Sequence, residues 1–404
     1  MSHTGKELRN GYTNMLTQAP TVDFYGLDEL LTAEERDVRQ RTRDFVVGRL
    51  LPLINECWER AEMPVELIGE LGQLGLIGGT ISSYGCPGLS AVGAGLVSLE
   101  LARGDGSFNT IMAVQSGLSM QSIFRFGSEE QRQHWLPALA RGEKIGAFGL
   151  TEPLIGSDAS HLQTTAQLVN GRYVLNGAKK WIGNASVADV TVIWARDDAG
   201  HVGAFLVEKH TPGFAAEAIT GKGAMRAVWQ ADIGLENCSV PVENRLPGAH
   251  GFRDTTEVLV RGRLGIAWSA LGHATACYEA ALAYTLARQQ FGKPLAAFQL
   301  VQDKLVRMVA EITAMQLLCW RASQLLDQGK LNPAMASLAK LNNARKARQI
   351  AADARDLLGG NGILLENNVI RHLTDIEAVI TYEGTDHMNA LVVGREITGL
   401  AAFI

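Results

Sequence analysis

Apolar positions recur at helical spacing through the first third of the chain. Val38, Phe45 and Leu50 stand at such intervals, and Thr32 with Glu35 three residues later has the pattern of a capping box. This part of the chain is therefore predicted to be helical. The expected helices cover residues 32–53, 65–74, 89–102 and 109–126, with a short one after Ser128.

The pattern changes near Lys144 to short runs of β-forming residues. Turn signals such as Asn170-Gly171 and Asn176-Gly177 separate these runs. The expected strands cover residues 145–150, 171–175, 190–195, 203–208 and 231–235. Together they predict a β segment of about 110 residues, folded as a small barrel or sandwich.

From Gly251 onward, long alanine- and leucine-rich stretches predict a four-helix bundle. These stretches cover residues 264–288, 300–326 and 333–358. The fold class is thus mainly α, with a β domain in the middle. We expect a helical domain over 1–145, in which 1–23 is an extension, a β-barrel-like domain over 146–255, and a helical bundle over 256–404.

Composition narrows the function classes. The 404 residues are 47% hydrophobic and 20% charged, with a net charge of −5, which gives no reason to expect nucleic acid as a partner. Residues 1–23 are polar and do not form a signal peptide pattern, and no run of roughly 18 apolar residues predicts a membrane span. The five cysteines are scattered, so we expect neither a zinc site nor disulfides, and a reducing, cytoplasmic location.

The loop Thr381-Tyr382-Glu383-Gly384-Thr385 contains the candidate catalytic residue, Glu383. An aromatic residue, a glycine and two threonines give this carboxylate little charged company. Partial burial there would raise its pKa and make it a usable base near neutral pH.

Two segments of the β region are candidates for cofactor binding. Residues 150–158 offer the hydroxyls of Thr151 and Ser157 with backbone N–H donors, which suit a polar ring or a pyrophosphate, although an ordinary turn fits as well. Trp181 stands close to Gly183 and can present a flat face to a planar cofactor, or serve as a core residue.

Two segments of the last region could bind phosphate or a nucleotide. Arg288 ends a long helix, where it can contact an anion or simply complement the helix dipole. The glycine cluster at 358–362 can approach a nucleotide or cap a helix. Dinucleotide, P-loop, metalloprotease and hydrolase motifs are lacking, and His134, His273 and His372 are interpreted as surface or core residues.

Taken together, these segments resemble the acyl-CoA dehydrogenase superfamily, from Phe24 to Phe403. The resemblance rests on ordered segments at 151–158, 181–184, 288–299, 358–362 and 382–385. The family fold is a helical domain, a β domain and a C-terminal four-helix bundle. Within the superfamily, the glutaryl-CoA dehydrogenases and the plant short-chain acyl-CoA oxidases look most similar.

The resemblance implies FAD-dependent α,β-dehydrogenation of an acyl-CoA thioester in a homotetramer. Glu383 would remove the α-proton while a hydride leaves the β-carbon for flavin N5. A flavin ribityl hydroxyl and the backbone N–H of Glu383 would stabilise the enolate oxygen. Electrons would pass to an electron-transfer flavoprotein or to oxygen, and no metal is implied.

The resemblance also implies roles for further residues. The FAD ring would meet Phe148, Leu150 and Thr151 at its pyrimidine edge and Trp181, Ile182 and Gly183 beside it. Thr385, Gly359 and Gly360 would serve the nucleotide half, while Arg288, Phe291 and Gln299 would reach the FAD of a neighbouring subunit. CoA and the acyl chain would contact Ser157, Arg263, Asn109, Ala113, Tyr382 and Gly384.

Two departures from the family pattern bear on the substrate and the acceptor. Glutaryl-CoA dehydrogenases hold the distal carboxylate with Arg and Ser where this chain has Asn109 and Ala113, so we expect glutaryl-CoA to be a poor substrate. Many relatives have Thr where this chain has Gly183, which leaves the acceptor open. A short-chain dehydrogenase is the leading hypothesis, ahead of an oxidase and of a glutaryl-CoA dehydrogenase. The nucleic-acid-binding alkylation-response branch, whose members carry an extra basic C-terminal region, is the least favoured hypothesis, because this sequence is net acidic.

Overall fold

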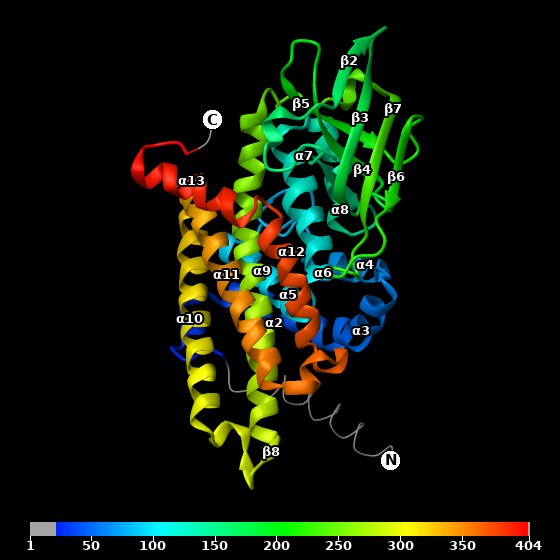
Figure 1. The fold of residues 1–404 in the computed structure, drawn as a ribbon. Coiled ribbons are helices and arrows are strands. Elements are labelled where there is room, and N and C mark those ends of the chain that lie inside the picture. Colours follow the sequence, from blue (N-terminus) through cyan, green and yellow to red (C-terminus); the bar gives the residue numbers. More distant parts are fainter. Residues whose placement is uncertain (1–21, 403–404) are drawn as a thin grey trace.

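The computed structural model describes residues 22–402, so most of the predicted extension 1–23 lies outside it. The described chain is helical, then β, then helical, as predicted (Figure 1). Its first part contains α2 (Ala33–Phe45), α3 (Leu51–Arg60), α4 (Glu66–Gln73), α5 (Ala91–Gly104), α6 (Gly106–Met112), α7 (Met120–Phe126) and α8 (Glu129–Ala140).

The predicted helix starts at Thr32 and Ser128 are confirmed. Thr32 and Glu35 form the capping box of α2, and Ser128 caps α8 in the same way with Gln131. The predicted helix over 109–126 is longer, because Asp105 caps α6 and a π-helical stretch, Ala113–Ser119, joins α6 to α7.

The middle part is one curled sheet that stands at one end of the helical body (Figure 1). Its strands run in the order β1-β4-β2-β3-β7-β6, with β5 paired to β4. They are β1 (Gly146–Gly149), β2 (Thr165–Val169), β3 (Arg172–Gly183), β4 (Val190–Arg196), β5 (Val202–Glu208), β6 (Phe214–Ala218) and β7 (Gln230–Pro241).

The sequence missed β2 and β6 and predicted only parts of β3 and β7. Strand β3 continues through Lys179, whose charged side chain breaks the apolar alternation that predicts a strand. Lys179 is nevertheless fully buried, because its Nζ lies 2.8 Å from the Glu152 carboxylate.

The last part is a bundle around one central helix, α9 (Phe252–Ala287), which packs against α5, α10 and α11. Helix α9 begins twelve residues before the predicted start at Leu264, close to the domain boundary that we propose at residue 256. The other helices are α10 (Gln299–Asp327), α11 (Pro333–Leu357), α12 (Val369–Thr381) and α13 (Asp386–Thr398), and a small hairpin, β8 (Gln289–Gln290) with β9 (Lys293–Pro294), follows α9.

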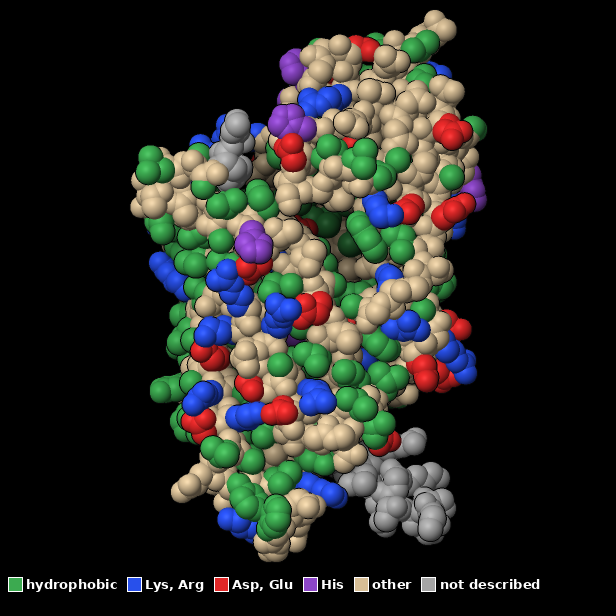
Figure 2. All heavy atoms as spheres, in the orientation of Figure 1, with side chains coloured by type: hydrophobic (Ala, Val, Ile, Leu, Met, Phe, Trp, Pro, Cys, Tyr) green, Lys and Arg blue, Asp and Glu red, His purple; other side chains and the backbone are tan. Residues whose placement is uncertain are grey.

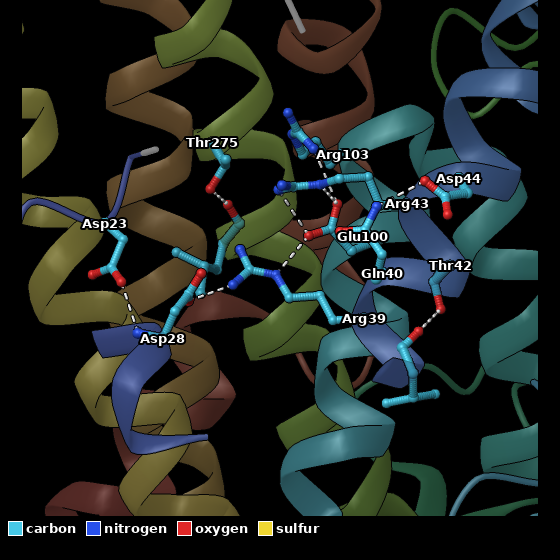
Figure 3. A network of polar contacts seen from close by, with 12 residues as sticks. Asp23, Asp28, Arg39, Gln40, Thr42, Arg43, Asp44, Glu100, Arg103 and Thr275 are labelled. Carbon is cyan, nitrogen blue, oxygen red and sulfur yellow. Dashed lines mark hydrogen bonds and ion pairs between the residues drawn. The ribbon is translucent and has the colours of Figure 1, made fainter. Parts of the chain in front are cut away.

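A buried ion network joins the two helical parts (Figure 3). Glu100 of α5 is fully buried and lies within 3.1 Å of the guanidinium groups of Arg39, Arg43 and Arg103. Arg103 also pairs with Glu279 of α9 at 2.7 Å. The three arginines lower the pKa of Glu100 to about 2 despite its burial.

Candidate active site

Glu383 lies in the short loop between α12 and α13. Its backbone is left-handed, with φ of 58°, which is rare for a residue with a long side chain. The Oε2 atom is buried and has no hydrogen-bond partner within residues 22–402. Burial raises the pKa of Glu383 to about 7, as the sequence led us to expect for a base.

The expectation of little charged company around Glu383 is wrong. The positive charges of Arg263 and Lys340 oppose the effect of burial on the Glu383 pKa. Arg263 Nε lies 3.4 Å from the backbone oxygen of Glu383, and its Nη1 lies 3.3 Å from Ser337 Oγ. The carboxylate is therefore buried near two cations without being hydrogen-bonded to either of them.

Two side chains that sequence reasoning missed hold the loop in place. Lys340 of α11 is fully buried and donates from Nζ to the backbone oxygens of Ile380 and Gly384, each at 2.9 Å. Asn389 Nδ2 donates to the Gly384 oxygen at 2.7 Å. One signal was available in the sequence, because Lys340 lies in an apolar stretch of the predicted helix.

The neighbours of Glu383 in the loop are fixed as well. The Thr385 hydroxyl accepts a hydrogen bond from the backbone N–H of Met388 and so caps α13. The Tyr382 hydroxyl lies 3.5 Å from the Thr110 hydroxyl, and burial raises the pKa of Tyr382. The loop is thus anchored to α6, α11 and α13.

Helix α9 leaves room for the carboxyl group. A Cβ built on Gly262 would lie 3.0 Å from the carboxyl atoms of Glu383, so a larger residue would displace that group. Gly262 also lines a cavity of about 140 Å³ between α5, the α6–α7 helix and α9. Asn109 and Ala113, the predicted acyl contacts, line the same cavity.

The cavity is also lined by a cationic side chain that the sequence did not reveal. This side chain is Arg261 of α9. The residues at positions 109 and 113 had led us to expect no cationic partner for a substrate carboxylate. Burial lowers the pKa of Arg261, and the negative charge of Asp327 partly opposes this effect.

The two candidate segments of the β domain meet each other. The backbone N–H of Lys180 donates to the Thr151 oxygen at 2.9 Å, which joins the end of β1 to the end of β3. Trp181 adopts φ of 62° and leaves 54% of its surface exposed, so its ring offers a flat face. The side chains of the predicted cofactor contacts Phe148, Leu150 and Ile182 are buried. Figure 2 shows the surface hollowed where the β domain meets the helices.

Gly183 is buried beside the helical domain. A Cβ at this position would lie 2.9 Å from Cγ2 of Val114, in the π-helical stretch between α6 and α7. The side chain that many relatives carry here therefore has no room unless Val114 moves.

The loop after β1 is held by a buried carboxylate that sequence reasoning did not single out. Glu152 pairs with Lys179 and accepts hydrogen bonds from the backbone N–H groups of Gln163 and Thr164 at 2.7 and 2.9 Å. Ser157, the predicted CoA contact, is exposed further along this loop.

A second group of predicted residues lies far from Glu383. Arg288, Phe291, Gln299, Gly359 and Gly360 are all exposed. Arg288 and Phe291 lie at the hairpin that Figure 1 shows at the end of α9 opposite to the β domain. Tyr284 Oη accepts a hydrogen bond from Asn361 Nδ2 at 2.8 Å, which ties the glycine turn to this end of α9. Within a single chain, Gly359 and Gly360 therefore lie apart from Thr385, because the glycine turn precedes α12 and Thr385 follows it.

Three family models match consecutive parts of the chain. They are the acyl-CoA dehydrogenase N-terminal domain over residues 32–143, the middle domain over 147–238 and the C-terminal domain over 249–398. The chain belongs to the acyl-CoA dehydrogenase family, whose members are oxidoreductases acting on CH–CH donors.

Relatives of known activity are similar over nearly the whole chain. The mitochondrial short-chain specific acyl-CoA dehydrogenase of Rattus norvegicus is 35% identical over 89% of both chains. A glutaryl-CoA dehydrogenase from Mycobacterium smegmatis is 43% identical, with a TM-score of 0.93 over 95% of this chain and 99% of that one, and a second structure of such an enzyme holds FADH2. Butyryl-CoA dehydrogenase from Megasphaera elsdenii is 33% identical, with a TM-score of 0.88 over 91% and 98%.

Membrane-spanning helices and clusters of potential metal ligands are both absent from residues 22–402. None of the helices there is long and apolar enough to cross a bilayer. The same residues contain no group of three potential metal ligands, and all five cysteines are free.

Proposed function

We propose that this protein is a short-chain acyl-CoA dehydrogenase in which Glu383 removes the α-proton of the thioester substrate. The observation that carries the proposal is the Glu383 carboxyl group, whose Oε2 is buried without a hydrogen-bond partner within residues 22–402 and which faces Gly262 at the edge of the cavity of about 140 Å³. A carboxyl group with a pKa of about 7 is half ionised at neutral pH and can accept a proton there.

The surrounding residues support the charge changes of this step. Arg263 and Lys340 favour the ionised form of Glu383 before the proton is taken up. The backbone N–H of Glu383 makes no backbone hydrogen bond within residues 22–402, so it is available to the developing enolate oxygen. Lys340 and Asn389 hold the backbone oxygen of Gly384, which helps to keep this N–H in position.

We propose FAD as the cofactor, which supplies the hydride acceptor when it is bound. The exposed ring of Trp181 and the polar edge at Thr151 fit a planar, polar ring system. Thr385 lies in the loop of Glu383 and is proposed for the nucleotide part. These residues would hold the cofactor beside the β-carbon of a substrate in the cavity.

A homotetramer would explain the predicted site residues that lie far from Glu383. Arg288, Phe291 and Gln299, with Gly359 and Gly360, would contact the FAD of a neighbouring subunit. Phe291 and Leu300 are 93% and 82% exposed, which is unusual for apolar residues of a monomer. Ser157 and Arg263 are proposed for CoA, and Tyr382 and Gly384 for the thioester end of the substrate.

The electron acceptor is proposed to be an electron-transfer flavoprotein, with oxygen as the second candidate. Gly183 favours the oxidase alternative, because no hydroxyl can stand beside the cofactor at this position. The free cysteines are in keeping with a cytoplasmic location, which we also propose.

The test is a panel of acyl-CoA substrates from C4 to C16, given to the FAD-loaded protein with an artificial dye or with oxygen alone. The proposal predicts highest kcat/KM at the short end with the dye, and slow peroxide formation without it. Fast peroxide formation would favour the oxidase, and preferred decarboxylation of glutaryl-CoA would favour the glutaryl-CoA dehydrogenase alternative.

A further inference from the structure

The indole ring of Trp268 fills the space where α9 packs against α5. A Cβ built on Gly95 of α5 would lie 2.2 Å from Trp268 Nε1 and 2.3 Å from its Cε2, so only a glycine at this position leaves room for the ring. Trp268 is 1% exposed, and both residues line the cavity of about 140 Å³ that Gly262 also lines. One part of the cavity wall is therefore a single large side chain packed directly on the backbone of α5.

A third helix holds this ring in place. Trp268 Nε1 donates a hydrogen bond to Ser323 Oγ of α10 at 3.0 Å, and both side chains are buried. An indole N–H can only donate, so this bond fixes which edge of the ring faces α10. Leu326, which follows Ser323 on α10, lines the cavity as well. Moving the ring aside would break the bond to Ser323 and leave a buried N–H unpaired, which is costly.

The ring stands a short way from the proposed base. Gly262 lies against the Glu383 carboxyl group, and Trp268 follows Gly262 by six residues on α9, which is about 9 Å along the helix axis. Most of the residues that line the cavity are apolar or glycine, as suits an alkyl chain. Since an apolar cavity of about 150 Å³ can hold benzene, the cavity of about 140 Å³ has room for about six carbons.

We propose that Trp268 sets the upper limit of acyl chain length, because its ring closes the cavity where α5, α9 and α10 meet. This inference rests on the proposed function, since it names the residue that limits the substrate in the same site. A chain longer than the cavity has to displace the ring from Gly95 and Ser323, and such overpacking of a filled interior is unfavourable. A chain that ends before the ring binds without this change, so the protein discriminates against long chains by exclusion.

The test compares kcat/KM for hexanoyl-CoA and decanoyl-CoA on the FAD-loaded wild type and on Trp268→Leu. In the wild type, hexanoyl-CoA should exceed decanoyl-CoA by at least about tenfold. Leucine removes most of the ring, so this ratio should fall close to one in Trp268→Leu, chiefly through a gain for decanoyl-CoA. Because the ratio compares two substrates on one variant, a general loss of activity does not affect it.

Trp135→Leu is the matched control. Trp135 of α8 is also a buried indole, but it does not line the cavity, so this variant should keep the wild-type ratio. Two milder variants keep the test valid if Trp268→Leu fails to fold. Trp268→Phe makes the ring smaller, and Ser323→Ala removes the acceptor that holds it, so both should lower the ratio by a smaller factor than leucine.

Several results would overturn the inference. These are a wild type that prefers decanoyl-CoA, an unchanged ratio in folded Trp268→Leu or in both milder variants, and an equal change of the ratio in Trp135→Leu. If the wild type oxidises neither thioester nor a shorter one, the proposed function fails instead. Calorimetry then decides the inference separately: the affinity for decanoyl-CoA relative to hexanoyl-CoA should rise in Trp268→Leu or in the milder variants, and an unchanged relative affinity would end it.

Discussion

A side chain at position 183 would clash with Val114, and the cost of this clash can be measured as a loss of folding stability. The Cβ of such a side chain would lie 2.9 Å from Val114 Cγ2, whereas carbon atoms pack best at about 3.5–4.0 Å. The backbone at Gly183 is not left-handed, so strain from φ does not enter. Gly183→Thr therefore overpacks a buried site, at a cost of about 1–3 kcal/mol in the free energy of unfolding.

Thermal unfolding of the FAD-loaded protein is the assay. Each kcal/mol shifts the Tm of a domain of roughly 150–250 residues by about 2–4 °C, so Gly183→Thr should lower Tm by several degrees. The double variant Val114→Ala with Gly183→Thr should recover much of this loss, because Val114 Cγ2 is gone.

The control is Gly234→Thr in β7, an exposed strand position with nothing within 4 Å of the built Cβ. We expect this variant to keep the Tm of the wild type or to exceed it slightly, because threonine suits strands. If Gly183→Thr unfolds at the wild-type temperature, the steric explanation of Gly183 is refuted.

Three further predictions concern charged groups. Glu383 has a folded pKa of about 7, above its unfolded value, so the folded state binds more protons and stability falls as pH rises from about 4.5 through 7. Glu383→Gln should thus raise Tm relative to wild type at pH 8 but not at pH 4.5, as a thermal scan at both pH values would show. Lys340→Met removes a cation that lowers the Glu383 pKa, so the acid limb of the kcat/KM–pH profile should move to higher pH, and an unmoved limb would contradict the assigned role. Glu100→Gln should destabilise the protein by about 3–5 kcal/mol in denaturant titrations near neutral pH, because three arginines lose their buried partner. The folded pKa of Glu100 is depressed, so its contribution is full above its unfolded pKa and fades as pH falls toward 2; a difference that persists unchanged at low pH would argue against this role.

Local sequence patterns were sufficient for most of the helices and for the burial of the Glu383 carboxyl group. Capping boxes such as that of Thr32 depend on residues three positions apart, and they appear in the structure as predicted. The rise in the pKa of Glu383 was also predicted, because burial within the loop disfavours the charged carboxylate.

Features that depend on distant partners could not be predicted in this way. From the sequence alone, Lys179 is expected to face solvent, because its partner Glu152 belongs to another segment of the chain. Lys340 lies 43 positions before Glu383, and only the packing of α11 against the loop shows that it holds the backbone oxygen of Gly384. Arg261 likewise lines the cavity beside Gly262 because of the rotation of α9, which periodicity alone did not determine.

The central claim is that Glu383 is the base that acts on the thioester substrate. The most direct measurement mixes FAD-loaded Glu383→Gln protein with butyryl-CoA in the absence of oxygen and follows the loss of flavin absorbance. Because glutamine cannot accept the α-proton, we predict that FAD remains bound while the absorbance change slows at least about a hundredfold relative to wild type. An absorbance change at the wild-type rate in this variant would contradict the claim.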